Sequence, residues 1–172
     1  MDKNWSTLSP YLNSAGYCVF ALNYGETNGV YATAAVADSA QQLASFVDKV
    51  RSAPQPGAVP DPNYTGVGRA ACADQQAGSP FMQKLDSVGD TVAGPSYTVI
   101  STVNDGVVIP YNSQFLNGPA RQVTNITIQD KCPADPIEHD QTPNDPVVHQ
   151  LVAHALGMAS GPADPAYQPN CV

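Results

Sequence analysis

Apolar side chains recur at intervals of three and four residues in three stretches of the chain, which is the spacing of an amphipathic helix. The pattern predicts helices over residues 5–15 and 36–50. A third helix is expected to begin at Ser79-Pro80, with serine as the N-cap and proline at the first helical position. A fourth helix is expected over residues 144–157.

Three short runs of strand-forming residues lie between these helices: YCVFAL at residues 17–22, YTVISTV at 97–103 and VTNITIQ at 123–129. Short runs of this kind fit strands that are covered on both faces, as in parallel sheets. Strands that alternate with helices predict an α/β fold with a short, mainly parallel sheet. We expect one domain over residues 1–172, with a loop rich in proline and glycine at residues 51–70.

The composition is that of a folded protein, and it narrows the classes of partner. Hydrophobic residues make up 42% of the chain and charged residues 13%, and the formal net charge is −8. The 7 lysines and arginines are too few to neutralise a phosphate backbone, so we expect no binding to nucleic acid. No apolar run reaches the roughly 20 residues of a membrane span, and the first residues lack the pattern of a signal peptide. Small neutral or apolar ligands remain as the class of partner that the composition does not exclude.

Two residues lie where α/β proteins place their chemistry, beyond the carboxyl ends of parallel strands. Asp105 directly follows the strand expected at 97–103, and His139 lies in the loop after the strand expected at 123–129. Each also has a purely structural interpretation. Asn104-Asp105-Gly106 is favoured turn chemistry, and His139 stands among acidic residues of a solvated loop. Position alone leaves both interpretations open.

Six segments carry a likeness to known sequences, in a matching order. They are WSTLSPYL (residues 5–12), GYCVFALNYG (16–25), YTVI (97–100), DGVVIPY (105–111), QFL (114–116) and VTNITIQDKC (123–132). Together they resemble the actinobacterial secreted lipases of the α/β-hydrolase class. The resemblance implies a reduced α/β-hydrolase-like fold. It also implies a secreted carboxylic ester hydrolase, a lipase or esterase, that acts on hydrophobic or short-chain esters and uses no cofactor.

The resemblance assigns roles to the two candidate residues. That family uses a Ser-His-Asp triad, in which the histidine takes the serine proton and the carboxylate holds the imidazole tautomer. The family aspartate follows the penultimate strand and the family histidine follows the last one, so these roles carry over to Asp105 and His139. We therefore expect the two side chains to lie within hydrogen-bond reach of each other.

The nucleophile of such a triad is not identified by the sequence. No G-x-S-x-G occurs anywhere in the chain, and the loop at 51–70 stands at the place of the family's nucleophile block. The family's oxyanion strand would lie before Trp5. Ser79, Ser101 and Ser113 suit structural roles better. Ser160 lacks the strand-turn-helix context of a nucleophile, and nothing around Cys72 indicates an activated thiol. We expect weak ester hydrolysis or none.

A metal site is the less favoured interpretation of the acidic loop around His139. Its ligand types suit calcium, but the loop lacks EF-hand spacing, so a solvated acidic loop is preferred. His149 and His154 are five residues apart on one helix and do not share a face, so they form no metal pair.

The four cysteines include no CxxC pair, which disfavours a zinc knuckle or a thioredoxin-type site. We expect a disulfide between Cys132 and Cys171 that ties the Pro-rich tail to the last strand. Cys18 and Cys72 lack the partners that the resemblance would provide, and we expect both to be free.

Three functional hypotheses stay open. The first is an ester hydrolase, the second a non-catalytic remnant that binds apolar ligands, and the third a partner-dependent fragment. The strands expected at 17–22 and 97–103 would each keep an unpaired edge, and an exposed apolar edge favours pairing with another chain. We therefore expect a homodimer through the exposed sheet edges.

Overall fold

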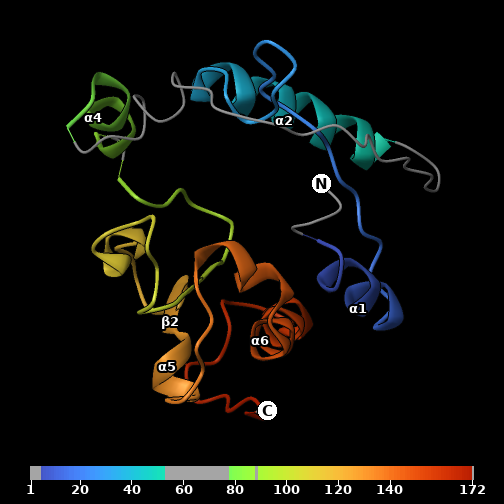
Figure 1. Cartoon of the computed structure of the whole chain (residues 1–172), viewed down its shortest axis with the longest axis vertical. Helices are drawn as coiled ribbons and strands as arrows, with labels where there is room; N and C mark the ends of the chain where they lie inside the picture. Colours follow the sequence, from blue (N-terminus) through green and yellow to red (C-terminus); the bar gives the residue numbers. More distant parts are fainter. Residues whose placement is uncertain (1–4, 53–77, 88, 172) are drawn as a thin grey trace. The chain divides into compact units, whose positions relative to one another are not determined.

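The computed structural model describes residues 5–52, 78–87 and 89–171 (Figure 1). The chain divides into two compact units. The helical unit comprises Met1–Asp2 and Cys18–Val88, and the sheet unit comprises Lys3–Tyr17 and Gly89–Val172. Helices mixed with a small parallel sheet place the protein in the α/β class. The expectation of one domain over residues 1–172 stays a prediction.

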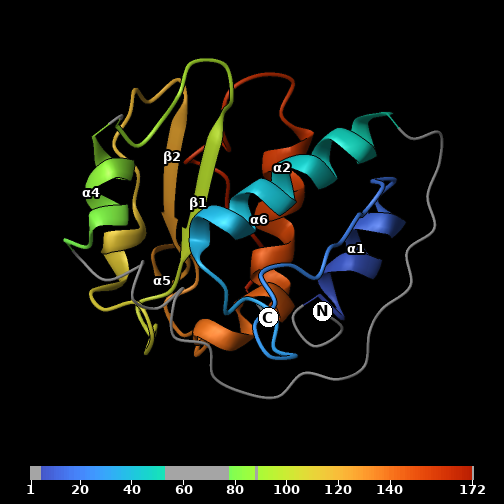
Figure 2. The same ribbon diagram turned by 90° about the horizontal axis from the view of Figure 1, so that it is seen from above.

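The sheet unit contains two parallel strands, β1 (Tyr97–Ser101) and β2 (Val123–Thr127), which lie side by side in Figure 2. Both expected strands are confirmed, but each ends two residues earlier than predicted. After β2 the chain turns at once into the short helix α5 (Ile128–Lys131), so Gln129 belongs to a helix. In the described part of the chain, the sheet has these two strands and no third.

The core of the sheet unit lies between one face of the sheet and helix α6 (Pro146–Gly157). Ile100 and Ile126 are register partners and therefore share that face, and the buried Leu151 of α6 packs in the same cluster. The other buried members of the cluster come from α5, α6 and the adjoining segments; they are Ile128, Cys132, Val147, Val148 and Ala163. Removal of apolar surface from water, at about 25 cal/mol per Å², is the main stabilisation of this unit.

Helix α6 begins at a strong start signal. The Asp145 carboxylate accepts a hydrogen bond from Val148 N at 2.8 Å, and Pro146 occupies the first turn, where no backbone donor is needed. The helix predicted over 144–157 is therefore confirmed, with its start two residues later. It ends at Gly157, as expected.

Helix α1 (Leu8–Ser14) confirms the first predicted helix, and it is followed by Gly16, whose φ of +90° suits glycine alone. The helix packs on α6 through His149. The ring of His149 lies 5.1 Å from the ring of Tyr11, and its Nε2 lies 3.0 Å from Pro143 O. These contacts bury His149 and give it a structural role.

The helical unit contains α2 (Val36–Ser52) and α4 (Pro80–Asp86), which confirm the second and third predicted helices. Ser79 caps α4 as expected, because its Oγ accepts a hydrogen bond from Met82 N at 3.0 Å. Residues 51 and 52 of the loop expected at 51–70 belong to α2, and the rest of that loop lies outside the described residues. Within the described ranges, no helix is both long and apolar enough to cross a membrane.

The strand expected at residues 17–22 is not formed, so this prediction and the three-stranded sheet built on it were wrong. Strand propensity acts through neighbours that supply ladder hydrogen bonds and cover the side chains. Here the segment forms no ladder with another described segment, and Cys18 and Phe20 are exposed. Without a neighbouring strand, the apolar run stays irregular.

Candidate active site

The segments that follow β1 and β2 bring Asp105 and His139 together. His139 Nδ1 lies 2.9 Å from Asp105 Oδ2, although the two residues are 34 positions apart in sequence. Neighbouring parallel strands end at the same edge of a sheet, so the segments that leave them meet there. The expected approach of the two side chains is thus confirmed as geometry.

The Asp105 carboxylate is buried and well supplied with hydrogen bonds. Its side chain is 4% exposed, and Oδ1 accepts hydrogen bonds from Val107 N at 2.9 Å and Val108 N at 2.8 Å. Oδ2 accepts a bond from Gln114 Nε2 at 3.0 Å beside the one from His139. Burial raises the pKa of this carboxyl, but the hydrogen bonds from His139 and the two backbone N–H groups outweigh burial and lower the pKa to about 2. Asp105 is therefore ionised at neutral pH.

The ionised carboxylate determines which nitrogen of His139 carries the proton. A carboxylate only accepts hydrogen bonds, so Nδ1 donates, and the neutral ring then presents an unprotonated Nε2. His139 opens the 3-10 helix η2 (His139–Asn144), and its side chain is 39% exposed. Among the described residues, Nε2 has no hydrogen-bond partner. The pair thus presents a basic nitrogen backed by a buried negative charge.

Among the described residues, no hydroxyl or thiol hydrogen-bonds to Nε2 of His139. Ser79 caps α4, and Ser101 is buried as the last residue of β1. Ser113 lies in the 3-10 helix η1 (residues 111–114), and Ser160 lies in a bend after α6. No nucleophilic side chain is therefore assigned to this nitrogen in the described part of the chain.

Three residues that support the pair were not predicted from the sequence. Gln114 donates to Asp105, and Thr102 Oγ1 donates to Ile137 O at 2.7 Å, which ties the Asp105 loop to the segment before His139. Gln129 Nε2 in turn donates to Thr102 Oγ1 at 3.0 Å. For Thr102 and Gln129, the only signal in the sequence is that they are polar residues at the carboxyl ends of the two strand-forming runs.

The loop that carries Asp105 exposes large apolar side chains. Val103 is 45% exposed, Val107 67% and Ile109 76%. Asp105 is the only charged residue between positions 103 and 116, and its carboxylate is buried. The surface that this loop offers is therefore uncharged and, at Val103, Val107 and Ile109, apolar.

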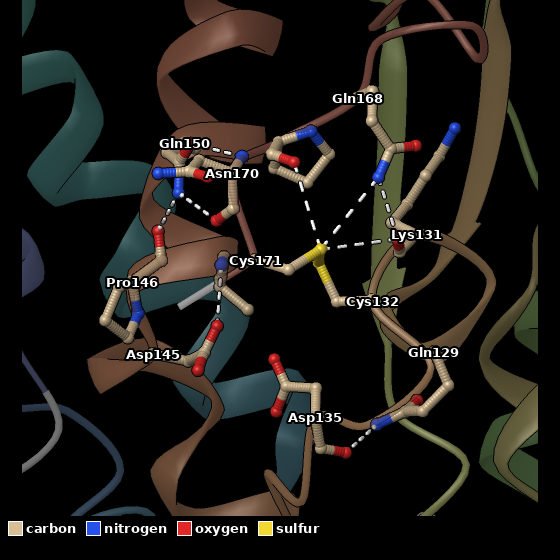
Figure 3. Close-up of a disulfide and its surroundings, with 12 residues drawn as sticks. Gln129, Lys131, Cys132, Asp135, Asp145, Pro146, Gln150, Gln168, Asn170 and Cys171 are labelled. Carbon is tan, nitrogen blue, oxygen red and sulfur yellow. Dashed lines mark hydrogen bonds between the residues drawn. A yellow bond between two sulfur atoms is a disulfide. The ribbon is translucent and has the colours of Figure 1, made fainter.

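Cys132 and Cys171 form the expected disulfide, with their Cα atoms 5.6 Å apart (Figure 3). It joins the residue after α5 to the end of the C-terminal segment, which is also hydrogen-bonded to α6. Cys18 is a free and exposed thiol, as expected. Cys72 lies outside the described residues, so the expectation that it is free stays a prediction.

Two of the acidic residues around His139, Asp135 and Asp145, have structural partners. Asp135 Oδ1 accepts a hydrogen bond from Ile137 N at 2.9 Å, and Asp145 caps α6. Burial, and to a lesser extent the nearby charge of Asp135, raise the pKa of Asp145. In the described part of the chain, no three His, Cys, Asp or Glu side chains gather closely enough to hold a metal ion.

The chain matches no model of a known protein family, and no curated protein matches it. Neither comparison bears on the resemblance to secreted lipases. The pair is thus interpreted from its own geometry: a buried ionised carboxylate, an oriented imidazole and an apolar loop beside them.

Proposed function

We propose that the chain is a reduced α/β-hydrolase-like ester hydrolase in which Asp105 and His139 form the acid–histidine pair. The observation that carries the proposal is the 2.9 Å hydrogen bond between His139 Nδ1 and the buried Asp105 carboxylate. In acyl transfer, such a carboxylate orients the imidazole, holds its tautomer and stabilises the imidazolium that forms. The segments that resemble secreted lipases support the same chemistry.

Water is the nucleophile in the proposed reaction. Nε2 of His139 takes a proton from water while the water oxygen attacks the ester carbonyl carbon, which gives a tetrahedral oxyanion. The bond to the alcohol oxygen then breaks, Nε2 returns the proton to that oxygen, and a carboxylic acid and an alcohol leave. Asp105 stays ionised throughout and offsets the charge on the ring. General-base assistance contributes roughly 10²–10⁴-fold, so turnover is slow.

The proposed substrates are small, uncharged carboxylic esters with an apolar acyl chain. Val107 and Ile109 expose apolar surface on the same loop that holds Asp105, and the first of them also donates its backbone N–H to the carboxylate. A net charge of −8 repels anionic ligands and has no such effect on a neutral ester.

We also propose that the protein is secreted. The disulfide between Cys132 and Cys171 supports this, because disulfides persist mainly in oxidising compartments. The resemblance to secreted lipases points to the same location.

Release of p-nitrophenol from p-nitrophenyl butyrate tests the catalytic proposal. Wild-type protein should hydrolyse the ester slowly, and His139→Ala should reduce the rate to background. His154→Ala is the matched control, because the ring of His154 stacks on Tyr167 at 4.0 Å and accepts a hydrogen bond from Asp164 N, with no carboxylate partner among the described residues. Activity that survives His139→Ala would place the chemistry elsewhere. A turnover of about 10 per second or more would reveal an overlooked nucleophile.

A second candidate function is the binding of apolar ligands without catalysis. It is favoured by the exposed apolar side chains of residues 103–109 and by the absence of a hydroxyl partner for Nε2 among the described residues. Calorimetric titration with a non-hydrolysable ether analogue of the ester separates the two functions. Binding without any hydrolysis by the wild type would support this candidate against the first.

We propose a homodimer formed through the sheet edges. The sheet in the described part of the chain has two strands, so the edge of β1 that faces away from β2 pairs with no described strand. An unpaired strand edge favours pairing with another chain. A two-fold axis would pair β1 with its own copy in antiparallel fashion and give four strands.

A further inference from the structure

A connected set of hydrogen bonds joins the loop after β1 to the segment that leads into His139. At its centre is Thr102, which is 1% exposed. Its Oγ1 donates to Ile137 O at 2.7 Å and accepts from Asn104 N at 3.1 Å and from Gln129 Nε2 at 3.0 Å. The hydroxyl thus contacts three different segments of the sheet unit at once.

Gln129 closes the set from the first turn of α5. Its Nε2 also donates to Asp135 O at 3.0 Å, the bond that Figure 3 shows as a dashed line, and its Oε1 accepts from Val103 N at 3.0 Å. The side-chain amide of Gln129 therefore hydrogen-bonds to the backbone of the loop after β1 and to the backbone of the segment that leads into His139. The exposed Asn104 adds two longer bonds of 3.3 Å, from Nδ2 to Asp135 O and to Ile137 O.

We infer that Thr102 and Gln129 are positioning residues that hold His139 against Asp105. Thr102 precedes Asp105 by three residues and Ile137 precedes His139 by two, so the bonds lie directly behind the pair. This inference rests on the proposed function in one respect: the geometry that these residues hold is the one that the proposed reaction needs.

The physical reason is that the pair itself is a single hydrogen bond between two loops. One hydrogen bond does not offset the conformational entropy that is lost when two loop segments become ordered. Catalytic groups need to be held within about 0.5 Å of their working geometry. Thr102 and Gln129 provide that restraint through hydrogen bonds that are mostly part-buried, whereas the ring of His139 is 39% exposed and therefore weakly restrained by packing.

The tautomer of the His139 ring gives a readout that a general loss of stability does not change. Held against the Asp105 carboxylate, the neutral ring carries its proton on Nδ1. A neutral imidazole released into water carries its proton mostly on Nε2. The ¹⁵N chemical shifts of the ring report the two forms directly, and His139→Ala assigns the signals.

The experiment compares Thr102→Val and Gln129→Leu with two controls, at a pH where the ring is neutral. In Thr102→Val and in Gln129→Leu, the His139 ring should lose the Nδ1–H tautomer in favour of the Nε2–H tautomer. Thr102→Ser keeps the hydroxyl and should retain Nδ1–H. Gln122→Leu removes two comparable bonds, to Val92 O at 2.6 Å and Pro95 O at 2.9 Å, before β2, and should also retain it. Asn104→Ala is a further variant that leaves the core intact, and it should weaken the Nδ1–H form partially.

An unchanged Nδ1–H tautomer in folded Gln129→Leu or Thr102→Val would overturn the inference, as would its loss in Gln122→Leu. The test is independent of the proposed function. A protein in which these variants shift the tautomer, but which hydrolyses no ester, would contradict the function and leave the positioning role in place. Hydrolysis that depends on His139 but is unaffected by Thr102→Val and by Gln129→Leu would contradict the positioning role and leave the proposed function in place.

Discussion

His139 and Asp105 are unequal partners in their hydrogen bond: the carboxylate is 4% exposed and the imidazole 39%. The Asp105 carboxylate also accepts hydrogen bonds from two backbone N–H groups and one side-chain amide, so its position does not depend on the hydrogen bond to His139. In the described part of the chain, the His139 ring leaves its second nitrogen, Nε2, free to contact solvent. This asymmetry is what a general base needs, because the charge stays in place while the proton moves.

Asp105→Asn should abolish ester hydrolysis while the fold is kept. The amide oxygen can still accept from Val107 N and Val108 N, but the NH₂ group now faces Nδ1 and favours the tautomer with its proton on Nε2. We expect a fall of about 10²-fold or more in the hydrolysis rate. Asp90→Asn is the control, since Asp90 accepts two hydrogen bonds from Asn117 and has no histidine partner among the described residues. Equal losses in both variants would contradict the assigned role.

Asp105 should also stabilise the fold in a defined pH range. Its pKa is lowered to about 2 in the folded protein, below the unfolded value of about 4. A depressed folded pKa gives stability that is present above the unfolded pKa and is lost as the pH falls through the folded pKa. The contribution is about 2 kcal/mol above pH ~4 and disappears towards pH ~2.

Urea unfolding of the wild type and Asp105→Asn at several pH values checks this expectation. The free energies of unfolding should differ by about 2 kcal/mol near pH 6 and converge near pH 2. Other carboxyls titrate equally in both proteins and cancel in the difference. A difference that does not depend on pH would contradict the pKa argument.

Asp145 should behave in the opposite sense. Burial and the charge of Asp135 raise its pKa, so its ionised form is disfavoured in the fold, although its oxygen caps α6 through Val148 N. Asp145→Asn keeps an N-cap acceptor and removes the charge, whereas Asp145→Ala removes both. At pH 7 we expect the asparagine variant to be no less stable than the wild type and the alanine variant to lose about 1 kcal/mol. Thermal unfolding compares them, and equal destabilisation by both would be inconsistent with this account.

Much of the helical structure was predictable because its signals are local. Ser79-Pro80 and Asp145-Pro146 each place a capping side chain before a proline, and both helices begin there. The run at residues 17–22 has equally strong strand-forming residues, but a strand also needs a partner that lies far away in sequence. That partner is not visible in a local pattern, and in the described structure the run makes no ladder.

The candidate site was predictable in part for a similar reason. The order of strands and loops, together with the family resemblance, indicated Asp105 and His139. The support from Gln114, Thr102 and Gln129 was not predictable, because it depends on where each side chain points once the loops have met. A threonine just after a strand and a glutamine at a helix start are common, so their polar character at these places does not distinguish these two.

Reduction of the disulfide should destabilise the sheet unit. Cys132 and Cys171 close a loop over a sequence separation of 39 residues, for which the chain-entropy estimate is roughly 4 kcal/mol. Urea unfolding with and without a reducing agent measures the change, and a Cys132→Ala, Cys171→Ala double variant should match the reduced protein. Thiol titration of the unfolded, unreduced chain should find two free thiols, Cys18 and Cys72. A count of four or of none would contradict this pairing.

The last prediction concerns assembly, and it follows from the hydrogen-bond pattern of β1. Tyr97 N donates to Gln122 O, so alternate residues from Tyr97 direct their backbone groups toward β2. Thr98 and Ile100 then direct theirs toward the opposite edge, which pairs with no strand in the described part of the chain. If this edge pairs with a second copy, these two amides should be protected from hydrogen exchange at high protein concentration and exchange faster on dilution.

Light scattering gives the matching mass: we expect twice 18.0 kDa at micromolar concentration, and an interface that buries well over ~1,000 Å². The amides of Tyr97 and Val99 serve as the internal control, since they face β2 and should exchange at a rate that does not change with dilution until the dimer and the fold are lost together. A monomer of 18.0 kDa with a cooperative melt would refute the homodimer. Protection of Thr98 and Ile100 that is independent of concentration would also refute it, because the edge would then be covered from within the same chain.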